Sequence, residues 1–249
     1  MQFLNGFMDL RERTNGGEKE IVGLPPWKRM LDLAVIIVLA PGALFIGALL
    51  ALVVRVGSPG PVLFRQRRVG FLGREFTCYK FRTMRDGAET DSHRHHTERL
   101  MSAGVPMVKL DAHADPRLIP FGAALRATGL DELPQLINVL RGEMSLVGPR
   151  PCVVYEYERY NASHRRRFEA VPGLTGLWQV SGKNRTTFEE MIRLDVEYAR
   201  RKSLGLDLKI LLITLPALWT QCRDIRAMKR RKARRPVAEI GKSAESLHL

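Results

Sequence analysis

An uncharged run from Leu33 to Val54 constrains the fold of this chain more than any other feature of the sequence. About 20 apolar residues are enough to cross a bilayer as one helix. Pro41 and Gly42 lie within the run, and an internal proline removes a backbone donor and bends or breaks a helix. Each half is then too short to cross, which favours a segment that enters the membrane and returns.

Basic residues flank this run on both sides. Lys28 and Arg29 precede it, and Arg55 begins the following basic stretch. Basic residues beside membrane segments favour the cytoplasmic side. A re-entrant hairpin bent at Pro41 keeps both flanks there, whereas a spanning helix places one of them outside. A kinked spanning helix and a buried core helix of a soluble protein are the alternatives, and the sequence alone leaves all three open.

The charge balance predicts a polyanionic partner. The chain has 40 Lys and Arg residues against 26 Asp and Glu, a net charge of +14, which suits an anionic leaflet, phosphorylated substrates or nucleic acid. Only 7% of the residues are aromatic, too few to favour stacking on nucleic-acid bases. The three cysteines lack CxxC spacing and indicate packing residues in a reducing compartment: Cys78, Cys152 and Cys222.

Short strand-like runs follow the turn cluster at residues 57–61. The runs at 62–66 and 75–84 predict a small β region close to the membrane exit. The polar residues 85–111 predict a surface loop or a short exposed helix. The histidines of this stretch have no second ligand pair at a zinc-like spacing, and we interpret them as solvated: His93, His95 and His96.

The most informative segment is GLDELPQLINVLRGEMSLVGPRP, residues 129–151. Its apolar residues recur with helical spacing and predict an amphipathic helix: Leu133, Leu136, Ile137 and Leu140. Pro134 fits the first turn of that helix and Gly142 its end. Asp131 and Glu132 then lie at the helix start, where backbone donors and the helix dipole keep carboxylates ionised. Taken alone, the pair is more simply explained as an N-cap Asp followed by a helix-favouring Glu, and only the surrounding motifs favour a catalytic role.

Three later segments complete the pattern. Residues 171–184 are rich in glycine and predict a loop that approaches a ligand closely, or a plain turn. Residues 186–203 predict a helix, with Thr187 and Glu190 spaced as a capping box. Residues 208–220, with the basic tail behind them, predict a segment lying on an anionic leaflet, or else a core helix followed by a disordered tail.

Taken in order, these segments resemble the monotopic phosphoglycosyl transferases, a family of bacterial sugar transferases. The resemblance runs from about Lys28 to Trp219. DELPQL and SLVGPRP are its most specific words. The matching stretches are 28–32, 64–70, 79–84, 115–118, 125–151, 172–184 and 194–210.

The resemblance implies an α+β, mainly helical, monotopic membrane protein. It has a re-entrant N-terminal helix hairpin bent at Pro41, interfacial amphipathic helices and a small β region. The implied divisions are a polar tail at 1–27, the re-entrant helix at 28–56, a cytoplasmic catalytic domain at 57–221 and a basic tail at 222–249. The expected place is the bacterial inner membrane, with the catalytic domain on its cytoplasmic face.

The resemblance also implies the chemistry. A sugar 1-phosphate would pass from a UDP-sugar to polyprenyl (undecaprenyl) phosphate, releasing UMP and initiating exopolysaccharide or another glycoconjugate. Asp131 would be the nucleophile and a ligand of the Mg²⁺ cofactor, and Glu132 would support proton or metal handling. Lys80, Arg82 and Arg150 would bind substrate phosphate. No nucleic-acid partner is implied.

The chain departs from the family pattern at three positions. Ala40 replaces the frequent serine before the bend proline, Glu143 a frequent aspartate, and Lys183 a frequent arginine.

Two other functions compete with this assignment. A membrane-attached basic protein for anionic lipid or nucleic acid leaves the DELPQL and GPRP words unexplained. A glycosyltransferase that moves the sugar without its phosphate often carries Asp-x-Asp, which this sequence lacks.

Overall fold

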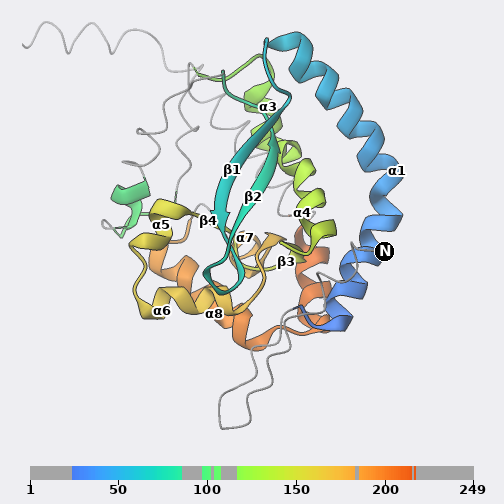
Figure 1. Cartoon of the computed structure of the whole chain (residues 1–249). Helices are drawn as coiled ribbons and strands as arrows, with labels where there is room; N and C mark the ends of the chain where they lie inside the picture. The colour runs from blue at the N-terminus through green and yellow to red at the C-terminus, as the bar shows by residue number, and fades with distance from the viewer. Residues whose placement is uncertain are drawn as a thin grey trace, which may run out of the picture.

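The computed structural model describes residues 24–85, 97–101, 104–107, 117–182, 185–214 and 216. These residues form a mainly helical structure with two small sheets, in which one long helix runs along a flank of the body (Figure 1). The predicted α+β, mainly helical class is therefore confirmed. The three histidines at 93–96, Lys183, most of the N-terminal tail and the whole basic C-terminal tail lie outside the described residues.

The predicted β region is an antiparallel hairpin of β1 (Leu63–Val69) and β2 (Glu75–Phe81). A short 3-10 helix, η2 (Phe71–Gly73), forms its turn. Strand β4 (Cys152–Val153) pairs with the other side of β1, giving the order β2-β1-β4. The outer edge of β2 is therefore an edge of the sheet, which matters for the site described below.

A second sheet joins β3 (Ser145–Val147) to β5 (Gly173–Thr175) in parallel. Between them the chain forms α5 (Val154–Glu158), α6 (Ala162–Arg165) and η5 (Arg166–Glu169). It continues from β5 through α7 (Leu177–Val180) into α8 (Phe188–Arg201). The capping box of α8 is confirmed, because the Thr187 side chain accepts from the Glu190 backbone N–H while the Glu190 carboxylate accepts from that of Thr187.

The apolar run near the N-terminus forms a single helix, α1 (Pro26–Gly57). By length and composition alone it could cross a membrane. The sequence predicts two arms broken at Pro41, but the structure has one continuous, bowed helix with Pro41 inside it (Figure 1). A hairpin of two arms is therefore not confirmed.

Both ends of α1 pack against the same body. Near its start, Ile36 belongs to a core cluster that includes Val139, Met144, Tyr198 and Ile210. Near its end, Val54 is buried in a second cluster. That cluster consists of Val54, Phe81, Ile119 and Leu125. Because one body holds both ends, α1 cannot place its ends on opposite sides of a bilayer unless the body crosses it as well.

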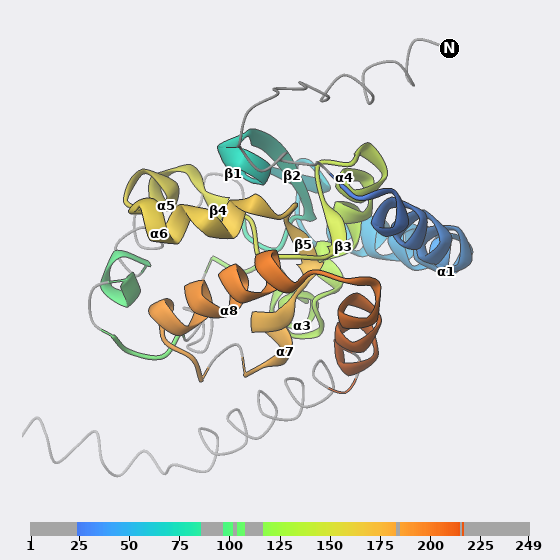
Figure 2. The same cartoon turned by 90° about the horizontal axis from the view of Figure 1, so that it is seen from below.

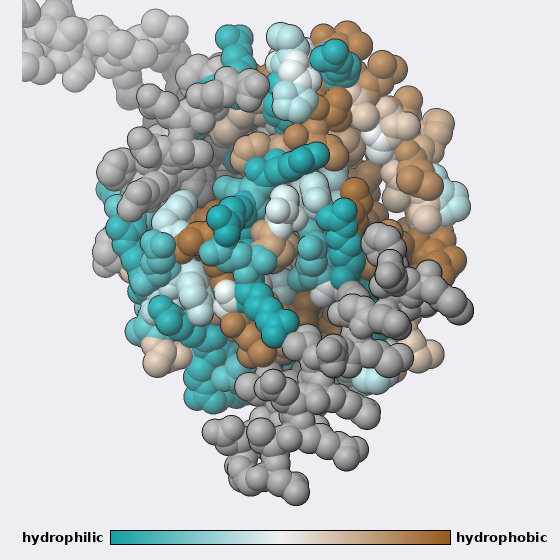
Figure 3. All heavy atoms as spheres, in the orientation of Figure 1, coloured by the Kyte–Doolittle hydropathy of each residue, from teal (hydrophilic) through white to brown (hydrophobic). Residues whose placement is uncertain are grey.

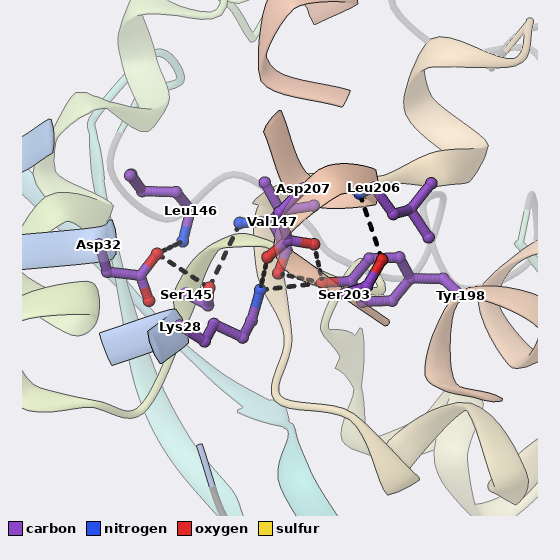
Figure 4. Close-up of polar contacts among 9 residues, drawn as sticks. All are labelled: Lys28, Asp32, Ser145, Leu146, Val147, Tyr198, Ser203, Leu206 and Asp207. Carbon is purple, nitrogen blue, oxygen red and sulfur yellow. Dashed lines mark hydrogen bonds and ion pairs between the residues drawn. The ribbon is translucent and has the colours of Figure 1, made fainter. Parts of the chain in front are cut away.

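A buried polar network fastens the start of α1 (Figure 4). Lys28 forms an ion pair with Asp207, and its ammonium group also donates to the Tyr198 hydroxyl at 2.9 Å. The Tyr198 hydroxyl donates to Asp207 Oδ1 at 2.7 Å. One turn later, Asp32 Oδ1 accepts from the Ser145 hydroxyl and from the Leu146 backbone N–H. The network thus joins the first described helix to α8, to β3 and to the helical residues 204–214.

The middle of α1 faces outward with large apolar side chains. Figure 3 shows this brown surface along the flank that α1 occupies. Four of its side chains are more than two thirds exposed: Ile37, Val38, Leu44 and Phe45. Seen from below (Figure 2), α4 (Leu136–Arg141) and the helical residues 204–214 lie at the same side as α1. They add further exposed apolar side chains: Ile137, Leu140, Leu204, Leu208 and Leu212.

We expect Lys28→Ala to destabilise the fold by about 3–5 kcal/mol, because it leaves the Asp207 carboxylate buried without its countercharge. The midpoint of thermal unfolding in detergent should fall by about 10 °C. Arg201→Ala breaks an exposed pair with Glu197 and serves as the matched control, with a midpoint near that of the wild type. Equal midpoints for the two variants would contradict a structural role for the Lys28 network.

Candidate active site

The two carboxylates singled out by the sequence lie in the first turn of a short helix. Gly129 adopts a left-handed conformation (φ 74°) and closes α3 (Gly122–Thr128), and η4 (Leu130–Gln135) follows at once. The predicted helix start is thus confirmed, but its first six residues form a 3-10 helix around Pro134 before α4 begins. Gly142, also left-handed, ends α4 as predicted.

The apolar side chains of this segment do not all face one way, because Val139 is completely buried and Leu136 packs against the core. Gln135 and Asn138 are buried, and Asn138 is completely enclosed. Ile137 and Leu140 of the apolar stripe are exposed, and Leu133 contacts α1 near Gly47. The polar side chains of this segment therefore face the protein, and part of its apolar stripe faces away from it.

Three of the predicted residues come together around one carboxylate. The Lys80 ammonium group donates to Glu132 Oε1 at 2.6 Å, and Arg150 Nη1 lies 3.8 Å from the same oxygen. Lys80 comes from β2, Glu132 from η4, and Arg150 from the loop after β3. The exposed fractions of these side chains are 16%, 25% and 30%, so the cluster is open to a ligand. Asp131, the neighbour of Glu132, is 8% exposed.

The backbone around Arg150 is held by the close parallel pairing of β3 and β5. The Gly148 N–H donates to the Thr175 carbonyl at 2.8 Å, and the Gly173 N–H to the Pro149 carbonyl at 2.9 Å. A Cβ atom on Gly148 would lie 2.2 Å from the Val171 carbonyl oxygen. Only glycine fits this position, because no side chain tolerates a backbone atom at that distance.

Two buried arginines, whose roles the sequence did not reveal, hold the same loop. Arg167 donates to the Arg150 carbonyl at 2.8 Å and forms a fully buried ion pair with Asp195. Arg68 donates to the Pro151 carbonyl at 2.9 Å. Arg68 and Asp195 lie in stretches that carry the family resemblance, but nothing local distinguishes Arg167 or Asp195 from surface residues of a helix.

Arg82 contacts the loop after α1 instead of the Lys80 cluster. Its side chain is buried, and its two terminal nitrogens donate to the Pro59 carbonyl at 2.6 Å and to the Ser58 carbonyl at 2.7 Å. The guanidinium therefore ties the end of β2 to the loop that follows α1. These contacts support a structural role, and the phosphate-binding role of Arg82 stays a prediction.

Two of the cysteines are ordinary packing residues. Cys78 and Cys152 are free and buried. Burial raises the pKa of the Cys152 thiol to about 12 and also raises that of Cys78. Neither thiol is ionised at neutral pH, so neither is a nucleophile that competes with a carboxylate. Cys222 lies outside the described residues.

The acidic side chains of the site fit a magnesium ion that arrives with its substrate. Within the described residues, no group of three or more His, Cys, Asp or Glu side chains could hold a metal ion by itself. Asp131 and Glu132 offer two carboxylates from consecutive residues. Mg²⁺ is commonly held by one or two carboxylates together with substrate phosphate oxygens, and such a pair meets that need.

Comparison with known proteins decides the family. Residues 25–221 match the bacterial sugar transferase family. The chain belongs to this family. The resemblance drawn from the DELPQL and GPRP words is thereby confirmed, and the chain is a sugar transferase.

Three relatives show how the likeness is distributed. The chain is 40% identical over 218 residues to the UDP-glucose:undecaprenyl-phosphate glucose-1-phosphate transferase of Caulobacter vibrioides, covering 82% of this chain and 74% of the relative. It is 36% identical to the exopolysaccharide production protein ExoY of Sinorhizobium fredii, covering 77% and 84%. It is 46% identical to the galactosyl transferase CpsE of Streptococcus agalactiae, covering 63% of this chain but only 34% of that longer protein.

We expect Lys80 and Arg82, two residues apart, to respond differently to the same change. Lys80→Gln removes a charge from a partly open cluster and should lower turnover about 100-fold with little change in the unfolding midpoint. Arg82→Gln removes buried hydrogen bonds to two carbonyls and should lower the midpoint by several degrees. Turnover and thermal unfolding are measured on both variants. A stable but inactive Arg82→Gln would return Arg82 to substrate binding.

Proposed function

We propose that this sugar transferase moves a sugar 1-phosphate from a UDP-sugar to undecaprenyl phosphate through a covalent intermediate on Asp131. The observation that carries the proposal is the cluster at the start of η4. There, Glu132 meets Lys80 and Arg150, Asp131 directly precedes Glu132 in the chain, and the exposed apolar flank of the molecule lies alongside. The name of the Caulobacter relative supports the reaction class. The names of relatives mention both glucose and galactose, so we assign the donor as a UDP-hexose without naming the sugar.

The reaction proceeds by two displacements at one phosphorus atom. An Asp131 carboxylate oxygen attacks the sugar-linked phosphorus of the UDP-sugar, and the bond to UMP breaks with its electron pair leaving on UMP. A phosphate oxygen of undecaprenyl phosphate then attacks the same phosphorus. The acyl phosphate bond breaks, the Asp131 carboxylate is restored, and the lipid carries the sugar on a diphosphate.

The basic residues make the approach of anion to anion possible. Lys80 and Arg150 place two positive charges around Glu132, next to the nucleophile, where a substrate diphosphate would lie. Bound Mg²⁺, held by Asp131 and Glu132, would supply further screening of the phosphoryl oxygens. Glu132, already paired with Lys80, would take part in proton or metal handling.

The exposed apolar flank supports monotopic attachment to the bacterial inner membrane. In water, the apolar side chains on α1, on α4 and at residues 204–214 would form a larger exposed patch than soluble monomers usually carry. Both ends of α1 are held by the body, so we propose that the helix re-enters rather than spans. Its bowed middle would enter the leaflet, and the site would face the cytoplasm at the interface, where a lipid phosphate and a soluble nucleotide sugar meet.

The decisive test of the mechanism is Asp131→Asn. Asparagine keeps any N-capping ability but cannot form the acyl phosphate, so turnover should fall by several orders of magnitude while the unfolding midpoint persists. Wild-type protein given UDP-glucose or UDP-galactose with Mg²⁺, but no lipid acceptor, should release UMP. It should also carry a phosphohexose adduct on the peptide that contains Asp131, and chelation of Mg²⁺ should prevent both. Release of UDP, an adduct on another residue, or an active Asn variant would overturn the assignment.

The proposed topology predicts that both ends of α1 lie in the cytoplasm. Single cysteines at the exposed positions Pro26→Cys and Pro61→Cys are introduced into a Cys222→Ser background, where buried Cys78 and Cys152 stay unreactive. A membrane-impermeant maleimide should label both sites only after the inner membrane is opened. A cysteine in a known periplasmic loop of another membrane protein is the positive control. Labelling of either site in intact spheroplasts would exclude a re-entrant helix.

A further inference from the structure

Asn138 lies at the centre of α4 with no exposed surface, six residues after Glu132. Its side-chain amide makes three hydrogen bonds. Oδ1 accepts from the Tyr79 backbone N–H at 3.2 Å. Nδ2 donates to the Thr77 carbonyl at 2.7 Å and to the Glu143 carboxylate at 2.6 Å. Each donor and the acceptor of this amide therefore has a partner.

The partners of Asn138 on β2 are the groups that another strand would use. β2 is an edge strand, and on its free side the Thr77 carbonyl and the Tyr79 N–H both face α4. A side-chain amide offers one acceptor and one donor at the spacing of a peptide group. Asn138 thus completes the sheet edge in place of a neighbouring strand. A carboxylate cannot do so, because it has no donor for the Thr77 carbonyl.

Glu143 determines which way this amide points. A carboxylate accepts only, so it must face the amide nitrogen, and the amide oxygen is left to meet the Tyr79 N–H. The Asn138 carbonyl also accepts from the Glu143 and Met144 backbone N–H groups, at 3.0 and 3.2 Å. The turn after α4 therefore contacts Asn138 twice, through its backbone N–H groups and through the Glu143 side chain that orients the Asn138 amide.

The position of the Lys80 side chain depends on this contact between Asn138 and β2. Lys80 follows Tyr79, and its ammonium group reaches Glu132 on the same helical segment that carries Asn138. Arg141 adds a second link, because its guanidinium donates to the Tyr79 hydroxyl at 2.7 Å. The contact between Lys80 and Glu132 can therefore form only when β2 and the η4–α4 segment keep the register that the Asn138 amide sets.

We propose that Asn138, oriented by Glu143, is a positioning residue that sets the geometry of the Lys80–Glu132 pair beside Asp131. This inference rests on the proposed function of that pair. Asn138 touches neither of the two groups; it acts through the strand that carries one and the helix that carries the other.

Asn138→Asp tests the proposal with a change of almost no volume. The new carboxylate faces the Thr77 carbonyl and the Glu143 carboxylate, and both repel it. A displacement of about 1 Å near a reacting centre costs about 100-fold in rate, so kcat for UMP release should fall about 100-fold. In a Lys80→Gln background, where the pair is already broken, the same change should cost less than about threefold, because coupled residues are not additive. Equal losses in the two backgrounds would overturn the proposal.

A second-site rescue separates positioning from simple loss of fold. Asn138→Asp combined with Glu143→Gln removes the repulsion from Glu143 and gives the new carboxylate an amide donor, while the repulsion from the Thr77 carbonyl remains, so it should recover part of the lost kcat. Asn161→Asp is the matched control, because Asn161 caps α6 at the exposed surface through its side-chain oxygen and aspartate caps equally well. It should leave kcat unchanged. A double variant no better than Asn138→Asp, at equal folded fraction, would contradict the role of Glu143.

Three further outcomes are distinguishable. If Asn138→Asp fails to fold, Glu143→Gln takes its place in the double-mutant cycle with Lys80→Gln. Glu143→Gln should then lower kcat in the wild-type background but not in the Lys80→Gln background. If wild-type protein releases no UMP, the proposed function fails before any variant is compared. If wild type is active and the cycle is additive, only the positioning role of Asn138 fails.

Discussion

The attachment of α1 at both ends is the constraint on which the rest of this structure depends. At the start of the helix, Lys28 is buried against Asp207 and Tyr198. At its end, Val54 lies in an apolar cluster and Arg82 holds the following loop. Burying a lysine and an aspartate costs several kcal/mol for each ion unless the two are paired. Because of this pairing, the start of α1 packs correctly only when residues about 180 positions later have also folded.

The start of α1 is connected to the candidate active site through α4. The Arg29 guanidinium donates to the Val139 and Leu140 carbonyls, at 2.5 and 2.7 Å, at the end of that helix. The Val139 carbonyl also accepts from the Gly142 N–H at 2.9 Å, and a cation near the last carbonyls of a helix is favourable. α4 in turn carries Asn138 and follows η4 directly. The long apolar helix and the carboxylates of the candidate site are thus joined by few, short connections.

Sequence reasoning succeeded where the signal is local. The capping box at Thr187 and Glu190, the left-handed Gly142 and the alternating strands around Lys80 each depend on neighbours a few residues away. It did not show the continuous α1 through Pro41 or the carbonyl contacts of Arg82, because distant segments determine both. It brought together Lys80, Glu132 and Arg150 only through family resemblance. Arg167 and Asp195 pair across 28 positions, and no spacing in the sequence marks them.

The segment from Leu130 to Arg141 buries two polar side chains and exposes two apolar ones, an arrangement that would suit an interface. Gln135 and Asn138 face the protein, where Asn138 holds the strand that carries Lys80, while Ile137 and Leu140 face outward beside α1. One short segment therefore presents two apolar side chains to its surroundings and the Glu132 carboxylate to Lys80 and Arg150. A lipid phosphate, whose chain belongs in the bilayer and whose charge belongs in water, meets both conditions only at such a boundary. On the proposed function, Asp131 in the first turn of this segment would lie where both conditions are met.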